Sequence, residues 1–247
     1  MSVKTFRTRL RAMTSDAVSE AAGRDRRKDP VLASTGGPAG NARLTAWTGV
    51  LLLVLFIAEL VTLLDVRQLV SWHVVIGVLL VPPALLKTGS AGWRILRYYT
   101  GHRPYRDAGP PPLLLRILGP LVVISTLAVL ASGLALIVAG PDNSRYVLVQ
   151  AFGQRVDALG IHQATFAVWA VATGLHTLGR ILPALRLTVI AQTTPRPVPG
   201  RYWRVSAMVV TLIAAAIAAP LVLGAAGAWH SQPSHRFPKP PGRHAAR

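Results

Sequence analysis

Long apolar runs dominate this 247-residue sequence, and short arginine-rich segments separate them. A helix needs about 20 consecutive apolar residues to cross a bilayer. Because backbone groups in lipid must find partners within their own segment, runs of this length predict helices. The runs cover residues 44–64, 69–91, 113–139, 160–182 and 205–229. We therefore expect an all-α, polytopic transmembrane helix bundle with about five spans.

The distribution of basic residues predicts the orientation of this bundle. Cytoplasmic loops of membrane proteins carry an excess of lysine and arginine. The connections 87–116 and 180–204 are strongly basic, whereas the 65–68 turn and the 140–160 connection balance arginine with aspartate. We therefore expect a multi-pass protein of the plasma membrane with a cytoplasmic N-terminus. The basic C-terminal tail, residues 230–247, then falls on the outer side and departs from the rule.

Polar segments flank the bundle, which is expected to occupy residues 44–229. Residues 1–43 are predicted to be a disordered basic cytoplasmic tail, and residues 230–247 a second disordered basic tail. No apolar core follows the first basic residues, so the N-terminus does not resemble a secretory signal peptide. A short amphipathic helix on the membrane surface over residues 6–13 is the alternative for part of the first tail.

Composition excludes several classes of function. The formal net charge of +18 would suggest nucleic-acid binding in a soluble protein. Here the charges lie in tails and loops, where anionic lipid attracts them, so no nucleic-acid partner is expected. Cysteine is absent, which excludes disulfides, Cys-ligated iron–sulfur clusters and thioether-linked haem. No nucleophile–base constellation or phosphate-binding glycine-rich loop appears, so a self-contained hydrolase or kinase is not expected.

Two histidines from different spans are the strongest candidates for a site, because ionisable groups inside spans are costly and by default functional. The second and fourth spans run in the same direction, so His73 and His162 should lie at similar depth near the outer surface. Gly77 shares the helix face of His73 and leaves room for a flat macrocycle. Two imidazoles on facing helices can ligate one haem iron from both sides.

Three further ionisable residues leave alternatives open. His176 lies 14 residues after His162, nearly four turns, so both project from one face. It is a candidate ligand of a second haem, a partner for a quinone, or a packing residue. Lys87, at the same interval after His73, would face it as a ligand or snorkel to lipid phosphate. Glu59 would relay protons to a haem propionate or a quinol, pair with a buried histidine or arginine, or be protonated in place.

Two histidines separated by thirteen residues on one span, facing a His-bearing span, resemble the b-type di-haem membrane cytochromes. This group includes cytochrome b561, hydrogenase b subunits and ferric-reductase-like proteins. About half of the chain, spans two to four, is also similar to a set of actinobacterial cytochrome b-like membrane proteins. The residues that carry this similarity are His73, Lys87, Arg94, Tyr98-Tyr99, Gly109-Pro110-Pro111 and Gly133. Lys87 departs from the pattern, because a four-histidine arrangement would place its last ligand there.

The resemblance implies a membrane-embedded b-type haem protein that transfers electrons between a quinone pool or membrane donor and a redox partner. A molybdopterin oxidoreductase is one such partner. The implied cofactor is haem b, its iron held by His73 and His162, with His176 and Lys87 beside any second haem. Such a chain is an electron-transfer subunit of an oxidoreductase rather than a self-contained enzyme. The alternative is a cofactor-free multi-pass protein, permease-like or an assembly subunit, whose histidines hydrogen-bond between helices.

Overall fold

Five long helices form the body of the protein in the computed structural model, which describes residues 3–22, 24, 29–151, 153–188 and 198–229. Each of the five is long and apolar enough to cross a membrane, which confirms the prediction of an all-α bundle with five spans. They are α2 (Gly37–Thr62), α3 (Val70–Tyr99), α5 (Leu113–Asn143), α6 (Ala158–Thr188) and α7 (Arg201–Ala225).

Shorter elements join or extend these helices. On the side of the basic connections lie α1 and α4, and on the other side lie two single 3-10 turns and a small antiparallel hairpin that the sequence did not lead us to expect. Their bounds are α1 (Val3–Ala21), η1 (Leu63–Asp65), α4 (Arg103–Asp107), β1 (Val149–Ala151), β2 (Gln154–Val156) and η3 (Gly227–Trp229).

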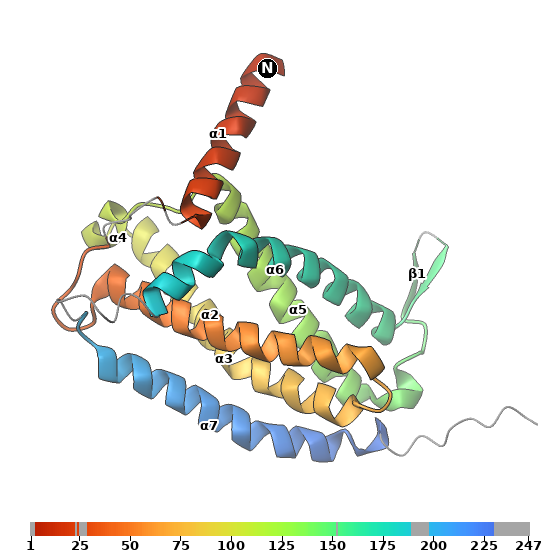
Figure 1. Cartoon of the computed structure of the whole chain (residues 1–247). Coiled ribbons are helices and arrows are strands. Elements are labelled where there is room, and N and C mark those ends of the chain that lie inside the picture. Colours follow the sequence, from red (N-terminus) through yellow and green to blue (C-terminus); the bar gives the residue numbers. More distant parts are fainter. Residues whose placement is uncertain (1–2, 23, 25–28, 152, 189–197, 230–247) are drawn as a thin grey trace, which may run out of the picture.

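Helices α3 and α6 face each other across the bundle but do not pack closely together. Helix α2 packs on α3 and α6, α5 packs on α6, and α7 lies against α3 at the edge of the bundle (Figure 1). Helices α3 and α6 make few direct contacts with each other, although α2 contacts both. Contact between α3 and α6 must therefore be made by their side chains, because their backbones do not approach closely.

The interior is narrow and rich in small side chains. Leu52, Leu80 and Ala84 form a buried cluster, with Phe56 and Leu130 packed against it. Many large apolar side chains point outward instead. In a membrane this is favourable, because lipid tails solvate them and helices associate mainly through close packing at small residues.

The helices differ from the predicted spans mostly at their ends. Helix α2 begins at Gly37 rather than at residue 44, and α3 continues to Tyr99, past the predicted end at residue 91. Helix α3 also continues through Pro82 and Pro83, which lie inside it. The thickness of the lipid bilayer sets a minimum length for a membrane-spanning helix. Polar residues outside the bilayer can extend the same helix further.

The N-terminal segment is more ordered than the sequence suggested. Part of the tail expected over residues 1–43 forms helix α1, and its last residues form the first turns of α2. The buried carboxylate of Glu20 accepts a hydrogen bond from Arg180 on α6, which attaches α1 to the bundle. The C-terminal tail, residues 230–247, with His230, His235 and His244, lies outside the described residues.

Candidate functional site

His73 and His162 face each other across the gap between α3 and α6. His73 lies in the first turn of α3 and His162 near the start of α6, so both are at the same end of the bundle. Their ring centroids are 6.3 Å apart and the rings are nearly perpendicular, at 82°. The structure thus brings together the two histidines that the sequence placed at one depth.

One nitrogen of His73 is held by two groups of α2. Its Nδ1 lies 3.0 Å from Oε1 of Glu59 and 2.9 Å from Oγ1 of Thr62. The Thr62 hydroxyl donates its own proton to the Glu59 carbonyl, at 2.6 Å. It therefore accepts from Nδ1, as the carboxylate does. This arrangement assigns the proton to Nδ1 and leaves the Nε2 lone pair available.

His162 is held in a matching way by α5. Its Nδ1 lies 3.0 Å from Oγ of Ser132, whose hydroxyl is also 3.0 Å from the Val129 carbonyl. When Ser132 donates to that carbonyl, its oxygen accepts from the imidazole N–H. A second hydroxyl, that of Thr165, lies 3.2 Å from Ser132 Oγ and completes the polar group. Nε2 of His162 is again the nitrogen left with a lone pair.

Two glycines lie close to the side chains of the site. A Cβ atom at Gly133 would lie 3.2 Å from Cε1 of His162, closer than side chains normally approach. A Cβ at Gly77 would lie 3.5 Å from Oε1 of Glu59, in ordinary contact. Gly133 is thus needed for the position of the His162 ring, whereas Gly77 borders the carboxylate that holds His73.

An aromatic layer closes the site toward the middle of the bundle. Phe56 and Trp169 have ring centroids 4.6 Å apart, and Phe166 lies 5.8 Å from Trp169. The indole N–H of Trp169 donates to Thr126 on α5, at 3.1 Å, which fixes the ring. The layer separates the two histidines from the polar residues beside the basic connections. We name the half of the bundle with the two histidines the outer half, and the half beside the basic connections the inner half.

The inner half does not repeat the arrangement of the outer half. Lys87 donates a hydrogen bond to the Thr45 carbonyl of α2, at 3.3 Å, and a Cβ at Gly49 would lie 2.6 Å from its Nζ. His176 lies near enough to interact with Lys87 electrostatically. Among the described residues, however, its buried Nδ1 has no hydrogen-bond partner, and neither has Oγ1 of Thr173. The hydrogen bond described for Lys87 is thus to α2, and none joins it to His176 among the described residues.

The separation of the two imidazole rings matches that of two imidazoles on one iron. Metal–imidazole bonds are about 2 Å long, so two axial imidazoles on one iron hold their ring centroids roughly 6 Å apart. The observed separation is 6.3 Å. Metal-ligating histidines also characteristically donate their other ring N–H to a carboxylate or another acceptor. Glu59 and Ser132 supply those acceptors.

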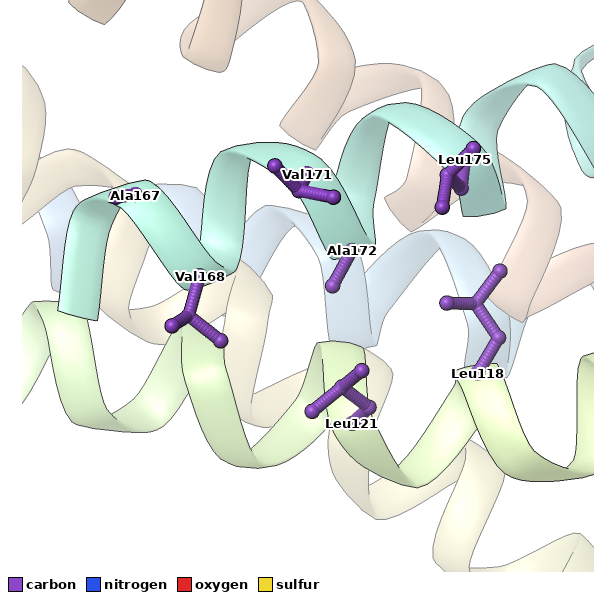
Figure 2. A pocket seen from close by; sticks show the side chains of 7 residues that line it. All are labelled: Leu118, Leu121, Ala167, Val168, Val171, Ala172 and Leu175. Atoms are coloured by element: carbon purple, nitrogen blue, oxygen red, sulfur yellow. The ribbon is translucent and has the colours of Figure 1, made fainter. Parts of the chain in front are cut away.

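Other features of the described chain offer less chemistry. Within those residues, no group of three or more His, Cys, Asp or Glu side chains could hold a metal ion. Figure 2 shows a groove of about 450 Å³ between α5 and α6, but carbon side chains alone line it and none would orient a polar ligand. Its lining residues are Leu118, Leu121, Ala167, Val168, Val171, Ala172 and Leu175.

Comparison of the chain with protein-family models, with curated proteins and with solved structures finds no match. The interpretation of the histidine pair therefore depends on its own geometry. Sequence reasoning missed Thr62 and Ser132, which hold the two rings. Thr62 lies three residues after Glu59 on the same helix face, and Ser132 directly precedes Gly133 in an apolar span. These two positions, read from the sequence, could have indicated hydroxyl groups beside the histidines.

Proposed function

We propose that this chain is a membrane-embedded b-type haem protein that transfers electrons, with His73 and His162 as the two axial ligands of one haem. The observation that carries the proposal is the facing pair of imidazoles, 6.3 Å apart, each with its Nδ1 held by a neighbouring helix. Helices α3 and α6 make few direct contacts, so the two rings are the groups that span the gap between them.

A bound haem would supply reversible one-electron chemistry at its iron. Ligation from both sides leaves no open position for oxygen, which favours electron transfer over oxygen activation. The chain's own residues would orient the two imidazole ligands and tune their basicity. The Glu59 carboxylate lies 3.0 Å from Nδ1 of His73 and would make Nε2 of that imidazole a stronger electron-pair donor to the iron. Phe56 and Trp169 separate the pair from the inner polar residues.

The position of the pair indicates the direction of exchange. His73 and His162 lie at the end of the bundle away from the basic connections, which the positive-inside rule assigns to the outer surface of the plasma membrane. In the proposed role, the chain passes electrons between a quinone pool or membrane donor and a redox partner such as a molybdopterin oxidoreductase. The same rule gives the N-terminus a cytoplasmic location.

The proposal assigns one haem rather than two. A lysine ligates a metal only when its amine is neutral, and the Lys87 ammonium is held by a backbone carbonyl of α2. Nδ1 of His176 has no hydrogen-bond partner among the described residues, whereas Nδ1 of each histidine of the pair has one. We therefore expect one haem per chain, and the same ratio in His176→Ala.

Absorption spectroscopy of the purified protein tests the proposal. With ample haem supply during expression, wild-type protein should be red and show a dithionite-reduced b-type α-band. His73→Ala and His162→Ala should each lose the band, since one imidazole does not hold the haem in the bundle. His102→Ala is the matched control, because this histidine packs edge-on against Tyr105 of α4, away from the pair, and the variant should keep the band. A folded but colourless wild type would instead favour the cofactor-free membrane protein.

A further inference from the structure

Helix α1 projects from the bundle and runs across the direction of the spanning helices (Figure 1). It contacts α6 and α5. In a protein whose long helices cross the bilayer, a helix that runs across them lies along the plane of the membrane. This orientation places α1 beside the bundle, over the lipid that surrounds it.

One face of α1 carries an apolar stripe that continues past the edge of the bundle. Phe6, Leu10, Met13 and Ala17 recur at the spacing of a single helix face. Met13 and Ala17 are half-buried, because the bundle covers this part of the stripe. Phe6 and Leu10 are 55% and 49% exposed, and the described residues leave them without a covering surface. The stripe therefore needs a partner at its N-terminal half.

Basic side chains border the stripe on both sides. By helical spacing, Arg7 and Arg11 flank it on one side and Arg9 on the other, and all three are exposed. The first acidic residue of the sequence is Asp16. An apolar stripe with basic flanks is the pattern of helices that lie in the headgroup region, apolar face toward the acyl chains. A nucleic acid or an acidic protein would match the charges but not the stripe.

We propose that α1 binds anionic phospholipid headgroups on the side of the basic connections, with Phe6 and Leu10 inserted at the acyl boundary. The bundle holds the helix in place for this contact. Buried Glu20 pairs with Arg180 near the end of α1, and Asp29 lies 3.4 Å from Arg94 of α3. Because the Glu20–Arg180 pair orients α1 in advance, lipid binding would require little further ordering.

The absence of cysteine permits a site-specific test on the full chain. A spin label at Phe6→Cys would report from the stripe, and a label at Thr8→Cys from the opposite face of the same turn. Each variant is reconstituted in phosphatidylcholine vesicles with and without phosphatidylglycerol. With the anionic lipid, the label at position 6 should become several-fold less accessible to an aqueous nickel chelate and more accessible to oxygen. The label at position 8 should stay accessible to nickel in both vesicles.

Removal of the charges separates lipid binding from other causes of protection. In phosphatidylglycerol vesicles, Phe6→Cys combined with Arg7→Gln, Arg9→Gln and Arg11→Gln should regain the nickel accessibility seen in phosphatidylcholine alone. Equal accessibility of position 6 in both vesicles would overturn the proposal. Equal protection in both vesicles and in the charge variant would also overturn it, since the stripe would then be covered by protein. Circular dichroism checks folding, and no outcome depends on haem.

Discussion

Whether a membrane histidine can ligate a metal depends on which of its nitrogens is already engaged. At His73 and His162 the engaged nitrogen is Nδ1, and the acceptors come from α2 and α5. None of these acceptors lies on the helix that carries the histidine. The tautomer of each ring is therefore a property of helix pairing, and a lone histidine in an apolar run gives no information about it.

The glycine beside His162 offers a direct test of the site. In Gly133→Ala, the new Cβ would lie 3.2 Å from Cε1 of His162, so the ring must shift by a few tenths of an ångström. We expect lower haem content per chain or a shifted α-band, measured by pyridine haemochrome assay and absorption. Gly119→Ala is the control on the same helix, because no atom lies within 4 Å of its added Cβ. Wild-type haem content and spectrum in Gly133→Ala would contradict the assigned geometry.

The lysine of the inner half should prove dispensable for cofactor binding. Lys87→Met keeps the length of the side chain and removes an ammonium whose described hydrogen bond is to the Thr45 carbonyl. We expect unchanged haem stoichiometry and equal or higher thermal stability, because a half-buried cation without an opposite charge among the described residues is costly. Haemochrome assay and thermal unfolding in detergent measure the two effects. Loss of haem in this variant would show that Lys87 is a ligand after all.

At the scale of the elements, α5 contains a break close to its outer end. Gly140 has φ 74° and ψ 167°, a conformation open in practice only to glycine, and Pro141 follows it. The helical turn of residues 141–143 therefore continues in a new direction, and Ser144 donates its backbone N–H to the Gly140 carbonyl. This break redirects the chain toward the hairpin that precedes α6.

Substitution at the break should destabilise the protein. Gly140→Ala places a Cβ on a backbone with positive φ, and strain of this kind costs about 1–3 kcal/mol. We expect a lower midpoint of thermal unfolding, followed by circular dichroism in detergent. In Gly119→Ala, by contrast, alanine replaces glycine within a helix, and the midpoint should stay equal or rise. Equal midpoints for Gly140→Ala and wild type would show that the break is not required.

At the scale of the whole molecule, the two ends of the bundle carry different polar groups, a histidine pair at one end and basic side chains at the other. The histidine pair and the hairpin lie at one end, and the basic connections with α1 and α4 lie at the other. The aromatic layer of Phe56 and Trp169 stands between the histidine pair and the inner polar residues. In the proposed function, this polarity would place the haem at the end of the bundle where the redox partner binds.

Cysteine labelling of intact cells tests the proposed orientation. Val147→Cys would stand in the exposed connection before the hairpin, and Thr100→Cys at the exposed end of α3. A membrane-impermeant maleimide should label position 147 in intact cells and position 100 only after permeabilisation. The cysteine-free wild type gives the background. The reverse pattern would place the histidine pair on the cytoplasmic side and would require a different redox partner.

The sequence alone determined the five spans, because the requirement of lipid is local. Each backbone group must be satisfied within its own helix, so the length and apolarity of a run suffice to predict it. The positions of His162 and His176 on one face also follow from the helical period alone. The direction of each span was enough to predict that His73 and His162 lie at similar depth.

Contacts between helices were decided only by the tertiary structure. That Glu59 holds His73, that Lys87 turns toward Thr45, and that Glu20 attaches α1 to α6 all depend on which helix faces lie together. Such pairings arise from the packing of many small side chains across the bundle. No spacing along a single segment encodes them, so the sequence indicated where the polar residues lie but not which of them meet.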